Sequence, residues 1–125
     1  MRVQIPILDQ EMIDGKLVNK ETTAVFNLDT SVYSEERWEQ NFPQLASKEG
    51  LFQYIERIQK HAVTERVRVA CMLKAIYCFI ESEELYSYKD FAQLFNLATP
   101  EYTSKLIETL YNSFKMILSG SSVKN

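Results

Sequence analysis

The residues best suited to chemistry are one histidine and two cysteines, His61, Cys71 and Cys78. An imidazole beside a thiol can make a nucleophilic pair. Both cysteines, however, lie inside the apolar run 69–80, and apolar surroundings raise the pKa of a thiol and so suppress the reactive thiolate. His61 ends a predicted helix, where the helix dipole stabilises a positive ring. We therefore expect a structural histidine and reduced core cysteines, and no thiol enzyme.

Metal and phosphate sites are not indicated either. One histidine and two buried thiols cannot complete a tetrahedral zinc site. The acidic runs at residues 35–36 and 81–84 lack the spacing of a calcium loop, and they suit helix ends at least as well. All three glycines are isolated, so the sequence has no phosphate-cradling loop. We expect no cofactor, no metal and no enzymatic activity.

Charge and length restrict the class of protein. The chain has 125 residues, the size of one domain, and a net charge of −3. Duplex binding needs a basic stripe, whereas the basic cluster at residues 57–68 is interleaved with Glu56 and Glu65. The N-terminus has no continuous apolar region and no cleavage site typical of a signal peptide. We expect a cytoplasmic protein that binds neither nucleic acid nor membrane.

The chain is organised around its most apolar stretch, residues 69–80, which carries one charge, Lys74. A helix that is apolar on every face is buried on all sides. At roughly 1.5 Å per residue it spans about 18 Å, too short for a bilayer, which takes roughly 20 residues. A buried strand would also be apolar throughout, but strands usually run about 4–8 residues. We predict a central buried helix over residues 64–82.

The N-terminal 31 residues are predicted to form an antiparallel β arm of two or three strands. Apolar residues alternate in 3–7 and again in 22–28, and Asp14-Gly15 is a hairpin turn signal. Pro6 lacks an N–H, which puts its strand at an edge or makes it irregular. Because two strands are marginal in water, the arm must lie on the helices or on a partner.

Residues 34–118 are predicted to form a bundle of about five helices. The fold class is then α+β, mainly α, in a single domain over residues 1–118 with a flexible polar tail at 119–125. Apolar stripes at helical spacing run through 51–62 and 106–118. The predicted helix starts are marked by capping residues, namely Ser34, Ser47, Thr64, Ser87 and Thr99 before Pro100.

Aromatic residues are the remaining candidates for binding. Most of them belong to the core by default. Trp38, on a short helix next to Phe42-Pro43, is expected to be partly exposed, and Tyr86 and Tyr88 flank a charged loop. Exposed aromatic side chains anchor protein interfaces, so these residues are candidate partner-binding sites. Alternatively, Trp38 pins the β arm to the bundle.

Several stretches together resemble the tail assembly chaperones of long-tailed (siphovirus-type) bacteriophages and prophages of Gram-positive bacteria. The first stretch, NLDTSVYSEERWEQNFP at 27–43, resembles the segment that enters the helices of these proteins. The pattern Glu-x-Leu-Phe-x-Tyr-Ile-Glu-Arg-Ile follows at 49–58. The C-terminal half continues the likeness through 73–80 and 91–95 to the tail at 121–125.

The resemblance implies a mainly helical, self-associating protein made in the infected host cell and absent from the mature virion. Such a chaperone coats the tape measure protein and keeps it soluble while tail tube subunits polymerise around it. A longer form, made by ribosomal frameshifting, recruits the tail tube protein. No residue-level motif for the tape measure contact carries over, and we expect the β arm to pair with a neighbouring subunit.

The alternative hypothesis is a small phage or bacterial regulatory module that binds DNA. Its helices near Arg57, Arg66 and Arg68 would supply the phosphate contacts. The acidic balance of the chain favours the chaperone.

Overall fold

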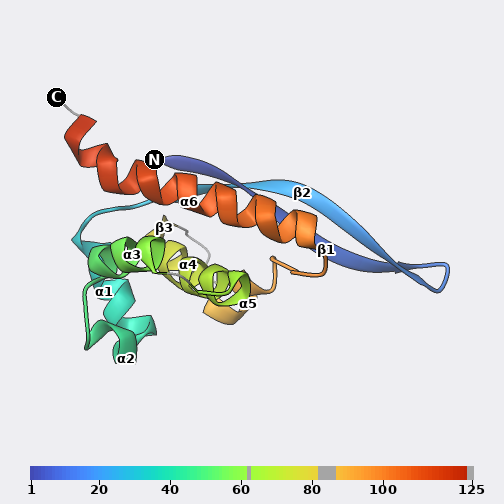
Figure 1. The fold of residues 1–125 in the computed structure, drawn as a ribbon, viewed down its shortest axis with the longest axis horizontal. Helices are drawn as coiled ribbons and strands as arrows, with labels where there is room; N and C mark the ends of the chain where they lie inside the picture. The colour runs from blue at the N-terminus through green and yellow to red at the C-terminus, as the bar shows by residue number, and fades with distance from the viewer. Residues whose placement is uncertain (62, 82–86, 124–125) are drawn as a thin grey trace.

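A computed structural model describes residues 1–61, 63–81 and 87–123 (Figure 1). These residues form three strands and six helices, so the class is α+β and mainly α, as predicted. The helix beyond the five expected is α2, a single turn. In chain order the elements are β1 (Arg2–Ile13), β2 (Lys16–Leu28), α1 (Val32–Asn41), α2 (Pro43–Ala46), α3 (Leu51–Lys60), α4 (Glu65–Phe79), β3 (Ile80–Glu81), α5 (Tyr88–Ala92) and α6 (Pro100–Val123).

β1 and β2 form one long antiparallel hairpin, which confirms the predicted β arm. Ile13 lies opposite Lys16, and the two residues between them make the turn. Asp14 and Gly15 both have positive φ, 51° and 77°. That pair of angles belongs to a type I′ turn, whose twist matches the strands that it joins.

Pro6 fits the hairpin because of the register. Residues that flank a two-residue turn form a hydrogen-bonded pair, and such pairs alternate with non-hydrogen-bonded ones along the strands. Counting from Ile13–Lys16 puts Pro6 opposite Thr23 in a non-hydrogen-bonded pair. Its missing N–H would have pointed away from β2, so the ladder loses nothing. β1 is an edge strand in the order β1-β2-β3, as Pro6 predicts.

The third strand corrects the predicted end of the central helix. α4 ends at Phe79, and Ile80 and Glu81 turn into β3, which pairs antiparallel with Leu28 and Asn27. The predicted helix over residues 64–82 is therefore too long by its last turn, and residue 82 lies outside the described residues. Apolar Ile80 suits a buried strand as well as a helix, so periodicity alone cannot separate the two.

α4 is the enclosed helix that the sequence predicts. Thr64 caps it, with the side-chain oxygen accepting a hydrogen bond from the backbone N–H of Val67. Around it pack α1, α3, α5 and α6. Its buried side chains are Val69, Met72, Leu73, Ala75, Ile76, Tyr77, Cys78 and Phe79.

α6 lies along the hairpin and contacts both β1 and α4 (Figure 1). Thr99 caps its start by accepting a hydrogen bond from the N–H of Tyr102 at 3.2 Å, as predicted. Leu106, Leu110 and Phe114 of the predicted stripe are fully buried. The helix continues to Val123, past the predicted end of the helical bundle at residue 118, while the predicted domain boundary there stays a prediction.

Two predicted helix starts are wrong because a neighbouring residue does the capping. Ser31, not Ser34, caps α1, and Ser34 is buried inside the helix. α3 starts after Gly50, and Ser47 instead ends α2. The predicted caps Ser87 and Thr99 are confirmed; the side chain of Ser87 accepts a hydrogen bond from the N–H of Asp90 at 3.1 Å.

Candidate polypeptide-binding surface

The three side chains first considered for chemistry differ in their burial. Cys78 is buried, and burial raises the pKa of its thiol to about 12, so it stays protonated. Cys71 is half-buried, and neither cysteine is in a disulfide. His61 is exposed at the end of α3, where its carbonyl accepts a hydrogen bond from Arg68 at 2.9 Å.

The first acidic run serves the packing of two helices. The carboxylate of Glu35 in α1 accepts a hydrogen bond at 3.0 Å from the N–H of Leu51, the first residue of α3. Negative charge at a helix N-terminus is favoured by the helix dipole. Within the described part of the chain, no group of three or more His, Cys, Asp or Glu side chains is placed to hold a metal ion.

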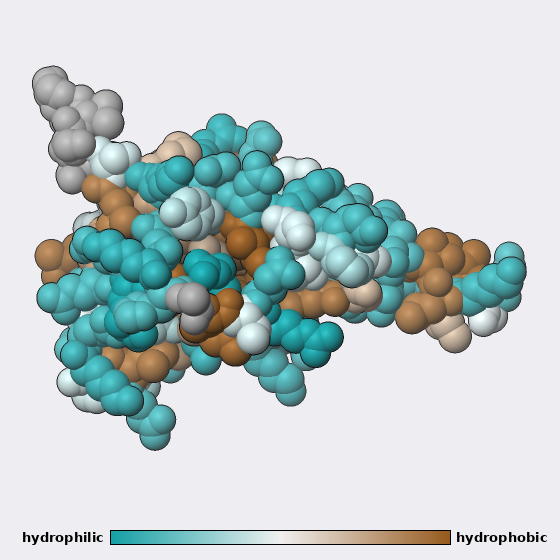
Figure 2. Space-filling view, viewed as in Figure 1, coloured by the Kyte–Doolittle hydropathy of each residue, from teal (hydrophilic) through white to brown (hydrophobic). Residues whose placement is uncertain are grey.

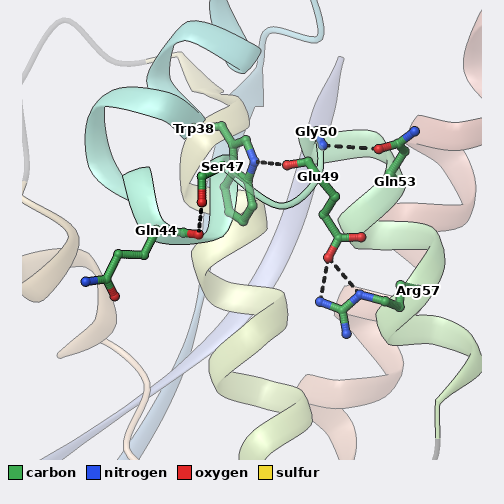
Figure 3. A network of polar contacts seen from close by, with 7 residues as sticks. All are labelled: Trp38, Gln44, Ser47, Glu49, Gly50, Gln53 and Arg57. Carbon is green, nitrogen blue, oxygen red and sulfur yellow. Dashed lines mark hydrogen bonds and ion pairs between the residues drawn. The ribbon is translucent and has the colours of Figure 1, made fainter.

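Trp38 is buried, so the prediction that it is partly exposed is wrong. Its side chain is 1% exposed. Its indole N–H donates a hydrogen bond to the backbone carbonyl of Glu49 at 3.0 Å (Figure 3). Its ring centroid lies 4.7 Å from that of Tyr54. Trp38 therefore fixes α1 to the loop before α3.

The loop that Trp38 holds is fastened by further polar contacts (Figure 3). The carboxylate of Glu49 pairs with the guanidinium of Arg57 at 2.6 Å. The N–H of Gly50 donates to the side chain of Gln53 at 3.3 Å, and Ser47 donates to the carbonyl of Gln44 at 2.8 Å. These polar contacts hold the connection between α2 and α3, which is not helical, in one conformation.

The structure describes two of the other three aromatic residues that are predicted to bind a partner. Phe42 and Tyr88 are half-buried, and their rings meet edge to face at 5.2 Å. Together they continue the Trp38 cluster towards α5, with Tyr77 5.6 Å from Tyr88. Tyr86 lies outside the described residues. The structure brings Trp38, Phe42 and Tyr88 together as a packing cluster.

The arginines of the alternative DNA-binding hypothesis are partly committed to internal contacts. Arg57 pairs with Glu49 and lies over the ring of Tyr54 at 5.3 Å. Arg68 donates to the carbonyls of Ile58 and His61 at 3.1 and 2.9 Å. Arg57 and Arg68 are thus engaged within the chain, whereas Arg66 is exposed.

Near its turn the hairpin presents four exposed apolar side chains close together. Met12 is 70% exposed and Leu17 is 60% exposed, and they form a cross-strand pair. Ile13 and Val18, also exposed, lie on the opposite face of the same ribbon. Figure 2 shows hydrophobic side chains gathered where the hairpin projects past the helices. We call Met12, Ile13, Leu17 and Val18 the hairpin tip.

Beneath the hairpin tip the ribbon is held by cross-strand contacts and by a hydrogen bond at 3.0 Å from the amide of Asn96 to the side chain of Gln10. The amide of Gln10 donates to Asn19 at 2.8 Å, and Lys20 lies 3.9 Å from Glu11. All residues from 11 to 23 are exposed. Two strands alone are marginal in water, and apolar side chains clustered on a projection mark an interaction site. The hairpin tip is therefore the candidate functional site.

The sequence contains a signal for the hairpin tip that differs from the alternation of apolar and polar residues expected of a strand with one buried face. Met12-Ile13 and Leu17-Val18 are adjacent apolar pairs on the two sides of Asp14-Gly15. Because neighbouring strand residues point to opposite faces, such pairs put apolar groups on both faces of a ribbon. A hairpin that covered the helices with one face only would not need them.

The chain matches no family model, and no curated protein and no solved structure matches it. Among the described helices, none is both long enough and apolar enough to cross a membrane.

Proposed function

We propose that this protein is a tail assembly chaperone of a long-tailed phage or prophage. It binds the tape measure protein without covalent chemistry and keeps it soluble while tail tube subunits assemble. The observation that carries the proposal is the hairpin tip, where four large apolar side chains stand in solvent on an arm that projects from the bundle.

An adaptable apolar surface is what a holding chaperone requires. The tape measure protein is expected to be a long helical chain with apolar surface that must be covered until the tube surrounds it. Met12 has a flexible, polarisable side chain that adjusts to irregular partners. Ile13, Leu17 and Val18 add apolar area on both faces of the ribbon. A projecting ribbon contacts a partner helix without displacing the packed core.

The proposal extends to further partners. Copies of the chain associate with one another on the tape measure protein, and a longer frameshifted form brings the tail tube protein. The proposed site of action is the cytoplasm of the bacterial host, and the protein is absent from the mature virion. The sequence likeness described above supports these points.

Co-expression tests the proposal. The tape measure protein encoded in the same genome is produced alone and together with this chain, and its soluble fraction is measured after centrifugation. We expect insoluble tape measure protein alone and a soluble complex in the presence of this chain. Precipitation of the pair would contradict the proposal. A gel shift in which the chain binds duplex DNA with a steep salt dependence would instead favour the regulatory module.

A further inference from the structure

We propose that a groove beside β2 binds an extended polypeptide strand that carries lysine or arginine among apolar side chains. The strand adds to the edge of β2 opposite β1, where no described residue other than those of β3 pairs with it. The groove is a cavity of about 590 Å³ between β2, α1, α5 and the end of α4. It is distinct from the hairpin tip, and the inference does not depend on the proposed function.

The hairpin register identifies the free edge. Counting from the hydrogen-bonded pair Ile13–Lys16, Val25 falls in a non-hydrogen-bonded pair with Gln4. Its backbone N–H and carbonyl therefore point away from β1. Asn27, two residues on, has the same parity and uses that outward edge to pair with Glu81 of β3.

The outer edge of β1 provides an independent check on which backbone groups point outward. Leu8 has the parity of Gln4 on β1, so its backbone should also point outward. The N–H of Leu8 does donate to the carbonyl of Leu94 at 3.2 Å, and its carbonyl accepts from Asn96 at 3.3 Å. The outward-facing backbone groups of Leu8 are thus bonded within the chain.

Among the described residues, no backbone partner is found for the corresponding groups of Thr23 and Val25. β3 pairs only with Asn27 and Leu28, and no other described residue pairs with β2 on that side. Thr23 and Val25 thus present outward N–H and carbonyl groups, and Val25 lines the groove. An open strand edge is a template for another strand.

The groove also offers apolar area. Val25, Tyr33 and Leu94 are exposed, and all three line it. Phe26 and Phe91 form part of the wall, with their rings edge to face at 5.7 Å. Alternate side chains of an added strand would rest on this wall, because successive residues of a strand point to opposite faces.

The charge of the groove selects a basic partner. Among the described residues that line it, Asp29, Glu81 and Asp90 carry carboxylates and Arg37 is the one with a basic side chain. The guanidinium of Arg37 is already engaged, since it donates a hydrogen bond to the carbonyl of Ile80 and lies 5.0 Å from the ring of Tyr77. The carboxylates therefore exceed the available positive charge, and a lysine or arginine of the added strand supplies it.

A free carboxylate at this place is maintained by local hydrogen bonds. The side chain and the backbone N–H of Ser31 hold the pKa of Asp29 below its usual value, and the N–H lies 2.9 Å from the carboxylate. Asp29 stays ionised as a consequence. A small molecule would satisfy the carboxylates but would leave the strand edge unpaired, whereas a basic strand satisfies both.

Peptide binding tests the inference with the intact chain. The probe is a fluorescein-labelled peptide of about ten residues in which valine alternates with lysine, and fluorescence anisotropy gives its affinity. One control replaces lysine by glutamate, and the other keeps lysine but carries N-methyl groups on alternate backbone nitrogens. We expect each control peptide to bind at least about tenfold more weakly than the lysine peptide. The glutamate peptide loses the charge-assisted hydrogen bonds, and the N-methylated peptide loses backbone hydrogen bonds.

Two variants locate the site. Val25→Pro removes the outward N–H without removing a bond to β1, and it should weaken binding about tenfold. The double variant Glu81→Gln, Asp90→Asn should bind the lysine peptide more weakly than the parent protein does. Its affinity for the glutamate peptide should not fall. Circular dichroism checks that each variant folds. If Val25→Pro does not fold, the N-methylated peptide still tests the strand edge.

Several results would overturn the inference. These are no binding of the lysine peptide at about 1 mM, equal affinity for the glutamate peptide, and equal affinity for the N-methylated peptide. A dimer that Val25→Pro turns into a monomer would show that a second copy occupies the edge.

Discussion

The buried hydroxyl of Tyr102 donates a hydrogen bond to the backbone carbonyl of Pro6 at 2.8 Å. The bond joins α6 to β1 across most of the chain length. An ion pair at 2.6 Å between Lys105 and Glu21 joins the same helix to β2. The base of the hairpin is therefore held by the helices, while its distal part stands free.

Tyr102→Phe should destabilise the protein. Removing the hydroxyl leaves the buried carbonyl of Pro6 without its donor, which costs about 1–3 kcal/mol. Denaturant unfolding followed by circular dichroism measures the loss. Tyr111→Phe is the control, because Tyr111 is only half-buried. Equal stability of both variants would show that the Tyr102 bond contributes nothing.

Trp38 should behave as a core residue. Trp38→Ala removes a fully buried ring and should cost about 3–5 kcal/mol in the free energy of unfolding. Trp38→Phe keeps part of the ring contact with Tyr54 but loses the indole N–H bond to Glu49, so it should cost less. A Trp38→Ala variant as stable as the parent would mean that Trp38 is exposed in solution.

Gly15→Ala should loosen the hairpin turn. Gly15 has φ +77°, and nothing lies within 4 Å of an added Cβ, so the cost is conformational, about 1–2 kcal/mol. Hydrogen exchange of the Val18 amide, which pairs across the ribbon with Glu11, should become about tenfold faster. Gly15→Asn is the control, since asparagine tolerates positive φ better. Unchanged exchange in the alanine variant would exclude this turn geometry.

Stability should fall at alkaline pH. Burial raises the pKa of Cys78 from 9.0 to about 12 and that of Tyr88 from 10.0 to about 12, and it raises the pKa of Tyr54 and Tyr102 further. The unfolded chain therefore loses these protons at lower pH than the folded chain. Their contribution is complete below pH 9 and is lost as the pH rises towards 12.

Thermal melts across this alkaline range measure the effect. The midpoint should decline steadily above pH 9, and more gently in Cys78→Ala, which has lost one of the titrating groups. A flat profile in the parent protein would mean that these side chains are hydrated in the folded state.

Local patterns in the sequence predict much of this fold. Asp14-Gly15 predicts the hairpin, because a type I′ turn needs residues that accept positive φ. The apolar run at 69–80 predicts the enclosed helix, and Thr99-Pro100 predicts the start of α6. Each of these signals is contained within a few residues of the structure that it specifies.

Features that depend on distant residues could not be predicted in the same way. α3 begins at Leu51 because the carboxylate of Glu35, sixteen residues earlier, accepts its N–H. Ile80 leaves the helix because Leu28 pairs with it in the sheet. The exposure of Trp38 was predicted wrongly since its partner, the Glu49 carbonyl, is a backbone atom that leaves no mark in the sequence.

The most direct test of the hairpin tip is the soluble yield of co-expressed tape measure protein with Met12→Ser, Leu17→Ser. The control is Val32→Ser, Met116→Ser, which also removes two exposed apolar side chains, one of them 75% exposed, but away from the hairpin. We predict that the tip variant folds and loses most of the soluble tape measure protein, while the control retains it. Equal yields from the two variants would contradict a holding role for the hairpin tip.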